Sequence, residues 1–207
     1  LTFEKKQALR YGENPHQEAA FYKELFADDR SIAAAVQLHG KALSYNNIRD
    51  ADAALQIVRE FDRPAVAAVK HMNPCGIGIG ETIGEAYAKA YEADPVSIFG
   101  GIIAANRPID AATAAEMAKL FLEIIIAPAF TPEALAILTK KKNIRLLTVN
   151  MAEADKGDRV LTSVSGGLLI QDADRLGLDD ARLSYPTKRR PNAEEMRSLA
   201  LAWKAVK

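Results

Sequence analysis

The sequence predicts an α/β fold in which a mixed, largely buried sheet is flanked by helices. Two kinds of segment point to this fold class. Short apolar runs typical of strands buried on both faces recur along the chain, including 65–69 and 123–128. Helical patterns lie between them, and the segment 47–61 has the clearest apolar face. Strands and helices alternate over most of the chain, without an internal repeat or a low-complexity tract.

Composition limits the classes of protein to consider. The 207 residues suffice for one large or two small domains, with a core that needs no disulfide. Lys plus Arg equals Asp plus Glu at 27 each, which argues against electrostatic binding to nucleic acid or to an anionic membrane. Cys75 is the single cysteine, and no transmembrane run or signal pattern occurs, so we expect a cytoplasmic protein. A first residue Leu1 and a helical pattern still running at Lys207 indicate a piece of a longer chain.

The first forty residues are predicted to hold a polar arm over 5–17 and short strands at 19–23 and 36–38. Arg10 and Tyr11 lie in the arm. Arginine offers a planar fork of donors to a phosphate or carboxylate, and tyrosine can stack on a base. On spacing alone, a solvated amino-terminal arm remains the favoured alternative.

The helix predicted over 47–61 leads into the stretch that carries the candidate chemistry. Its apolar face is expected to be Ile48, Ala51, Leu55 and Val58, and Asn46 or Asn47 is expected to cap it.

A buried strand over 65–69 then ends at Lys70 and His71. Ligands gather at the carboxyl ends of strands in open α/β sheets, which makes this pair a candidate site. Adjacent strand side chains point to opposite faces, so the two could equally be unrelated. Residues 73–80 hold three glycines and a proline, and we expect an irregular loop that a ligand can approach closely.

The middle of the chain continues the alternation. A helix over 82–93 begins with a capping-box sequence. A strand over 96–99, a break at Gly100 and Gly101, and a second apolar run over 102–105 follow. The glycine pair is either a bulge or a place where a ligand meets the backbone.

Further elements are an Ala-rich helix over 110–121, the strand over 123–128, a helix from Thr131 and a strand over 144–149. Glu123 begins its strand, where an exposed glutamate without a special role is the commoner case.

The last part of the chain is predicted to form a hairpin over 159–171, a polar surface connection over 172–190 and a helix that Asn192 caps. The apolar stripe of this helix is Leu199, Trp203 and Val206.

Two familiar motifs are excluded. The glycines of 76–80 lack the spacing of a dinucleotide fingerprint. Pro74-Cys75 is similar to the Pro-Cys of zinc deaminases, but those need a second cysteine where Gly78 stands and a His-x-Glu that is missing, so no zinc or other metal site is expected. A Cys75 nucleophile beside His71 is conceivable, although a lone cysteine in a glycine turn is more often inert.

Three segments together carry a resemblance to a known family: Arg10–Gln17, Lys70–Gly76 and Asp94–Gly101. The chain resembles bifunctional purine biosynthesis proteins, AICAR transformylase/IMP cyclohydrolase. It is similar over its whole length to the first half of their transformylase domain. The resemblance implies a fragment, residues 1–207, with the topology of a cytidine-deaminase-like subdomain but without zinc. The cyclohydrolase domain and the second transformylase subdomain are then expected outside it.

The activity implied by the resemblance is transfer of a formyl group from 10-formyltetrahydrofolate to the 5-amino group of the nucleotide AICAR. The family builds its active site across a homodimer, and its folate contacts lie in the second subdomain. We therefore expect the 207 residues alone to be inactive. The alternative is a nucleotide-binding or structural scaffold half that has no catalytic role.

The resemblance also implies site residues. The family's catalytic Lys-His pair corresponds to Lys70 and His71, with His71 as proton shuttle and Lys70 as its modulator. Positions that contact the nucleotide correspond to Arg10, Tyr11, Phe99 and Gly100, and also to Asn47 and Glu123. The family has Asp in some members where this chain has Glu123.

Overall fold

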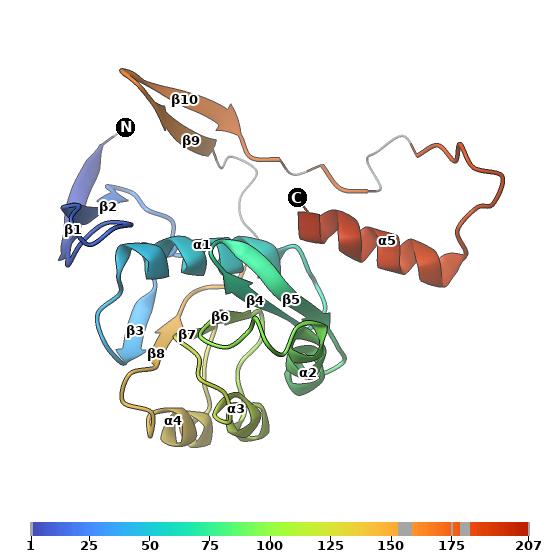
Figure 1. Cartoon of the computed structure of the whole chain (residues 1–207), viewed down its shortest axis with the longest axis horizontal. Coiled ribbons are helices and arrows are strands. Elements are labelled where there is room, and N and C mark those ends of the chain that lie inside the picture. Colours follow the sequence, from blue (N-terminus) through green and yellow to red (C-terminus); the bar gives the residue numbers. More distant parts are fainter. Residues whose placement is uncertain (1, 153–158, 175, 179–182, 207) are drawn as a thin grey trace. The chain divides into compact units, whose positions relative to one another are not determined.

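The computed structural model describes residues 2–152, 159–174, 176–178 and 183–206. They divide into two compact units, on either side of residue 152, each of which is described by itself (Figure 1). In the part of the chain that is described, no helix is both long enough and apolar enough to cross a membrane.

The first unit contains both strands and helices. Its strands are β1 Phe3–Leu9, β2 Ala19–Glu24, β3 Val36–His39, β4 Ala65–Lys70, β5 Asn73–Ile79, β6 Ile102–Ala105, β7 Ile124–Ala127 and β8 Arg145–Thr148. Its helices are α1 Tyr45–Arg59, α2 Ile83–Ala93, α3 Ala111–Met117 and α4 Pro132–Leu138.

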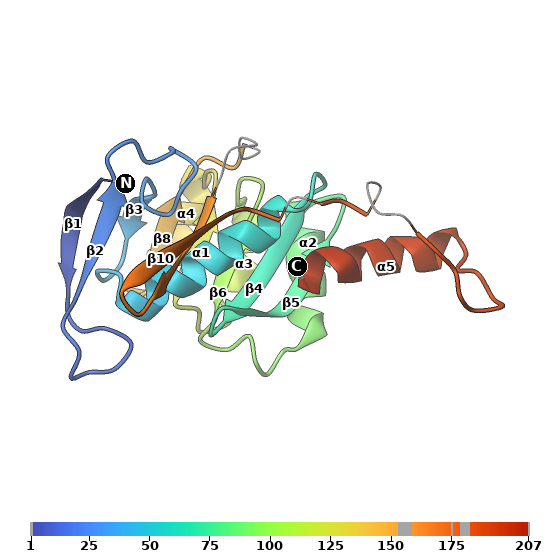
Figure 2. The ribbon, with the colours of Figure 1, turned by 90° about the horizontal axis from the view of Figure 1, so that it is seen from above.

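A six-stranded mixed sheet in the order β3-β8-β7-β6-β4-β5 forms the centre of this unit. β6, β7 and β8 are parallel to one another, whereas β4 runs antiparallel to both β6 and β5. Helix α1 covers one face of the sheet, and α2, α3 and α4 cover the other (Figures 1 and 2). The predicted α/β class with a mixed, buried sheet is confirmed.

The α1 helix packs on the sheet through small and branched side chains, as its pattern predicted. Ala51, Ala54, Leu55 and Val58 are all fully buried. The predicted cap was wrong, because Ser44 caps the helix: its hydroxyl accepts from the Asn47 amide, and the Asn47 side chain accepts from the Ser44 amide. Asn47 is therefore the third helical residue and the reciprocal partner in a capping box.

Residues 73–79 form a strand, so the predicted glycine loop was wrong. β5 pairs with β4 along its length, and α2 packs directly on it. A Cβ atom at Gly76 would lie 2.0 Å from the carbonyl oxygen of Ala90, and one at Gly78 would lie 2.0 Å from that of Ala86. These glycines therefore allow a helix backbone to approach the strand closely, which is a packing role.

The strand predicted over 96–99 is also wrong, because this segment is a turn that Asp94 holds. The Asp94 carboxylate accepts from the amides of Val96 at 3.1 Å and Ser97 at 2.8 Å. The hydrogen bonds from Ser97 keep the pKa of the Asp94 carboxyl below its usual value. Val96 is 82% exposed as a result, and the strand is confined to β6.

Residues 5–9 of the polar arm predicted over 5–17 belong to β1, which pairs antiparallel with β2 in a separate two-stranded sheet, and residues 12–17 form bends and turns. Its alternation of charged and apolar residues is weak because the strand is mostly exposed. A salt bridge of 2.6 Å joins Glu4 to Lys23, which face each other across the pair.

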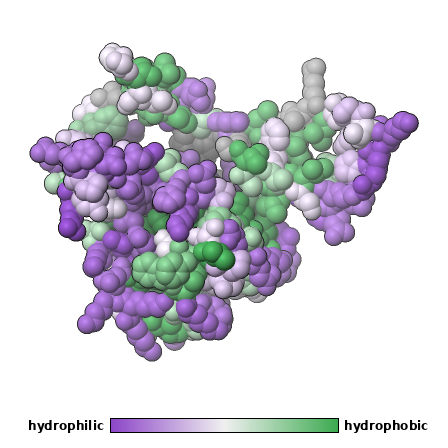
Figure 3. Space-filling model, in the orientation of Figure 1, coloured by the Kyte–Doolittle hydropathy of each residue, from purple (hydrophilic) through white to green (hydrophobic). Residues whose placement is uncertain are grey.

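The second unit contains the predicted hairpin, β9 Arg159–Val164 and β10 Gly167–Asp172, and helix α5 Ala193–Val206. Asn192 caps α5 and Glu195 completes the capping box, as predicted. Exposed apolar side chains on the hairpin, among them Leu168, Leu169 and Ile170, give it hydrophobic colours in Figure 3. The predicted connection over 172–190 lies partly outside the described residues.

The close approach of α2 to β5 predicts a specific cost for Gly78→Ala. The new methyl group would overlap the Ala86 carbonyl, so we expect the free energy of unfolding to fall by about 1–3 kcal/mol. Urea unfolding followed by circular dichroism measures it. Gly167→Ala is the matched control, since its Cβ meets only Val164 at 3.4 Å, and a change of about 0.5 kcal/mol or less is expected. Equal effects for both variants would contradict the packing role.

Candidate functional site

The direction of β4 places the candidate Lys-His pair. Because β4 is antiparallel to β6, its last residues lie beside the first residues of the parallel strands. In the register, Val69 is opposite Ile102, Ile102 opposite Ile124, and Ile124 opposite Arg145. We call this end of the sheet, where β6, β7 and β8 begin, the amino end. The carboxyl end of the parallel strands, where ligands of open α/β sheets usually gather, lies opposite.

Lys70 links this strand to the turn that follows α2. Its ammonium group donates a hydrogen bond of 3.0 Å to the carbonyl oxygen of Phe99. The Phe99 ring lies 5.4 Å from the ring of Phe121, and the two are 56% and 48% exposed. Gly100, at φ +73°, donates from its amide to the Phe121 carbonyl at 2.8 Å. The site therefore includes an exposed aromatic pair beside a lysine.

His71 lies in a two-residue turn between β4 and β5. Both turn residues have positive φ, 55° for His71 and 65° for Met72. The rule that strand neighbours point to opposite faces therefore does not describe Lys70 and His71, since only Lys70 belongs to the strand. His71 is exposed, and its backbone amide is held by Asp50 of α1.

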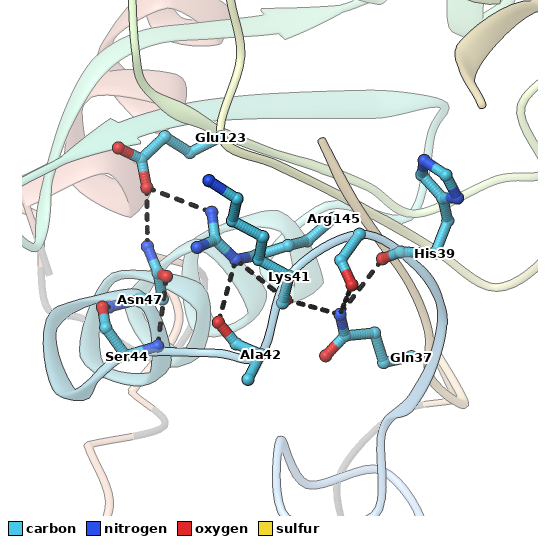
Figure 4. Close-up of polar contacts among 9 residues, drawn as sticks. Gln37, His39, Lys41, Ala42, Ser44, Asn47, Glu123 and Arg145 are labelled. Carbon is cyan, nitrogen blue, oxygen red and sulfur yellow. Dashed lines mark hydrogen bonds and ion pairs between the residues drawn. The ribbon is translucent and has the colours of Figure 1, made fainter. Parts of the chain in front are cut away.

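A second polar cluster lies at the same end of the sheet and is drawn in Figure 4. The Glu123 carboxylate accepts a hydrogen bond of 2.8 Å from the Asn47 side chain and forms an ion pair of 3.5 Å with the Arg145 guanidinium. The Glu123 side chain is 40% exposed, whereas that of Arg145 is 14% exposed. Glu123 is therefore a fixed carboxylate with two partners, and it still has access to solvent.

Backbone hydrogen bonds connect this cluster to the Phe99 turn. The Glu123 amide donates to the Gly101 carbonyl at 3.0 Å, and the Arg145 amide donates to the Glu123 carbonyl at 3.0 Å. Sequence reasoning missed Arg145. The sequence feature that could have identified Arg145 is its position at the start of a buried strand, β8. This strand lies next to β7, which Glu123 directly precedes.

A loop before α1 completes the surroundings of Arg145. The Arg145 Nε donates to the carbonyl oxygens of Lys41 and Ala42, at 3.2 and 3.3 Å. The Gln37 side chain donates to the carbonyl of Lys41 at 2.7 Å and to those of Gly40 and of His39, the last residue of β3 (Figure 4). Gln37 on β3 and Arg145 on β8 thus both fix this loop.

Arg10 and Tyr11 follow β1, and the Arg10 guanidinium lies 5.7 Å from the centre of the Tyr11 ring. The nearby Glu13 side chain forms an ion pair of 3.5 Å with Arg49, and the Glu13 carbonyl accepts a hydrogen bond of 3.5 Å from the Asn46 side chain, both partners lying at the start of α1. Within the described ranges, no hydrogen bond or ion pair joins Arg10 or Tyr11 to the Lys70 and His71 pair. The structure therefore brings together Lys70 with Phe99 and Asn47 with Glu123, and leaves Arg10 and Tyr11 near the start of α1.

Cys75 lies half-buried on β5, where its thiol makes a 3.4 Å contact with the Ala68 carbonyl. Burial raises the pKa of this thiol, which disfavours the reactive thiolate. Over residues 2–152 and the later described ranges, no group of three or more His, Cys, Asp or Glu is placed to hold a metal. A hollow of about 390 Å³ lies at the other end of the sheet, beside Pro128, Thr148 and Asn150.

The family model and the similar proteins found by comparison all point to the same family. A family model described as AICARFT/IMPCHase bienzyme matches residues 1–207. The chain is 66% identical over 207 residues to the bifunctional purine biosynthesis protein PurH of Bacillus cereus strain G9842 and to that of Bacillus anthracis strain A0248. PurH of Bacillus cereus strain B4264 is 65% identical. In each case all of this chain is matched, and it spans 40% of the length of the relative.

The raised thiol pKa predicts slow alkylation of Cys75. In the folded protein, iodoacetamide should react several-fold more slowly than in urea at pH 8, and the rate should rise to its plateau at a higher pH than in the unfolded chain. Mass spectrometry of the single labelled site measures both. A plateau at or below the pH found in urea would mean that Cys75 is an activated thiol, contrary to this account.

Proposed function

The chain belongs to the AICARFT/IMPCHase bienzyme family, and from that premise we propose that it is part of a formyltransferase of purine biosynthesis. The complete protein would transfer a formyl group from 10-formyltetrahydrofolate to AICAR, and it would also carry the cyclohydrolase activity for which the family is named. The proposal is made for the complete protein, since the chain spans 40% of the length of its relatives. The observation that carries it is the placement of Lys70, His71 and Glu123 at one end of the sheet.

The reaction requires a proton to move between two nitrogen atoms. The 5-amino group of AICAR is a weak nucleophile because the neighbouring carboxamide withdraws its lone pair. A new C–N bond forms between this amine and the formyl carbon, and the bond from that carbon to the folate nitrogen breaks. The proton lost by the amine has to reach the leaving folate nitrogen. An imidazole can accept and return such a proton, which is typically worth about 10²–10⁴-fold in rate.

His71 suits this role because it is exposed and its backbone is held in a tight turn. Lys70 is the neighbouring cation, held against the Phe99 carbonyl. It would modulate the imidazole or help to carry the proton to the folate nitrogen. Neither role requires a metal ion or the Cys75 thiol.

The nucleotide would lie along the amino end of the sheet. Phe99 and Phe121 offer an exposed aromatic surface to its base, and Glu123 offers fixed acceptor oxygens to its hydroxyl or amino groups. Arg10 would bind the phosphate, and Tyr11 would stack on the base or hydrogen-bond to the nucleotide. Asn47 would act through Glu123.

The proposed active site also needs residues outside these 207. The folate would be held mainly by the part of the protein that the 207 residues do not contain, and the active site would be shared across a homodimer in the cytoplasm. The isolated 207 residues would then be inactive. The alternative is a scaffold half with no catalytic group, and it is consistent with the lack of any hydrogen bond or ion pair, among the described residues, between Arg10 or Tyr11 and Lys70 or His71.

Changing His71 to Ala in the complete protein distinguishes these two functions. We expect turnover to fall by about 10²–10⁴-fold while AICAR binding, measured by calorimetry, changes little. His39→Gln is the control: His39 lies in β3 and contacts the Lys141 carbonyl at 3.2 Å, so turnover should stay near the wild-type value.

Near-wild-type formyl transfer by the His71→Ala variant would contradict the catalytic role and favour the scaffold. A loss of turnover that follows entirely from lost AICAR binding would make His71 a binding residue instead.

A further inference from the structure

The turn that carries His71 has an unusual backbone. Two consecutive residues other than glycine, His71 and Met72, adopt positive φ angles of 55° and 65°. They connect paired residues Lys70 and Asn73, so the turn has the type I′ geometry of a two-residue hairpin. That geometry favours Asn-Gly and similar pairs, because a Cβ atom is unfavourable at positive φ. Histidine and methionine therefore need outside support to hold it.

Asp50 supplies this support from another element. One of its carboxylate oxygens accepts a hydrogen bond of 2.8 Å from the Met72 amide, and the other accepts one of 3.3 Å from the His71 amide. The Asn73 side chain donates to the His71 carbonyl at 2.8 Å on the other side of the turn. Both amides of the turn are thus bound by a single carboxylate.

The position of Asp50 is itself well fixed. It lies on α1 directly before Ala51, which is fully buried, and one turn before Ala54, which is also fully buried against the sheet. The helix therefore presents the carboxylate to the turn at a set distance. The direction of the His71 side chain follows from the φ and ψ angles that these two hydrogen bonds stabilise.

We propose that Asp50 is a positioning residue for His71. It holds the two turn amides so that the imidazole points to where the proton is transferred. This inference rests on the proposed formyl transfer. Asp50 acts through the backbone and touches neither the substrate nor the imidazole. Without the carboxylate, the turn would relax toward angles that His71 and Met72 prefer, and the imidazole would be displaced.

The test uses the complete protein and a rescue. Asp50→Ala should lower kcat for formyl transfer by about 10²-fold with KM for AICAR changed less than about threefold, since small misplacements of a catalytic group cost this much. Met72→Gly added to Asp50→Ala should restore about tenfold, because glycine adopts positive φ without support. Asp52→Asn is the matched control on the same helix: its carboxylate accepts from Gln56, and kcat should stay unchanged.

Unchanged kcat in Asp50→Ala would overturn the proposal. So would a loss that Met72→Gly does not restore at all, because a directly catalytic or purely structural carboxylate would not be replaced by a glycine in the turn.

A second readout separates this proposal from the proposed function. Hydrogen exchange followed by mass spectrometry should show faster exchange over residues 70–73 in Asp50→Ala, because the His71 and Met72 amides lose their acceptor. If the wild-type protein transferred no formyl group, the proposed function would fail while this readout still decided whether Asp50 holds the turn. Exchange over 70–73 that is the same with and without the Asp50 carboxylate would overturn the positioning role.

Discussion

The reversal of β4 within the sheet is the constraint on which the candidate site depends. β6, β7 and β8 run parallel, and β4 beside them runs the other way. The carboxyl end of β4 therefore meets the amino ends of three other strands. The Phe99 turn, Glu123 and Arg145 share this end because β6, β7 and β8 are parallel, and the reversal of β4 brings Lys70 to the same end. Had β4 been parallel, its terminal residues would lie at the other end of the sheet.

Helix α1 organises the same end of the sheet from one face. Asn47 and Asp50 lie three residues apart, so they project from the same side of the helix. Asn47 binds Glu123, and Asp50 binds the turn that carries His71. The alanines of α1 bring the helix close to the sheet, so both contacts can form directly. On the opposite face, the glycines of β5 let α2 approach the hairpin in the same way. Small residues on both faces thus fix the strands whose connecting turn bears the imidazole.

The buried parts of the fold were predictable from sequence, and the failures have a common cause. Runs such as 65–69 are apolar because both faces are covered, and this pattern survives in the sequence. The glycines of β5 resemble a loop in the sequence. They are required because the backbone of α2 packs against them, and the local sequence does not reveal that contact. Ile98 looks like part of a strand but is a buried anchor inside a turn that Asp94 holds. For the site, Lys70, Phe99 and Glu123 lie at one end of the sheet, whereas Arg10 and Tyr11 lie near the start of α1. Asp50 and Arg145 act through contacts 21 or more residues away and carry no motif.

The claim that most needs testing is that the nucleotide binds at the amino end of the sheet. Hydrogen exchange of the complete protein, with and without saturating AICAR, measures this directly. We expect protection at 70–73, 99–101 and 123–124, with little change at 128–130 and 148–151. Protection confined to the second pair of segments would place the ligand at the carboxyl end of the parallel strands and contradict binding at the amino end.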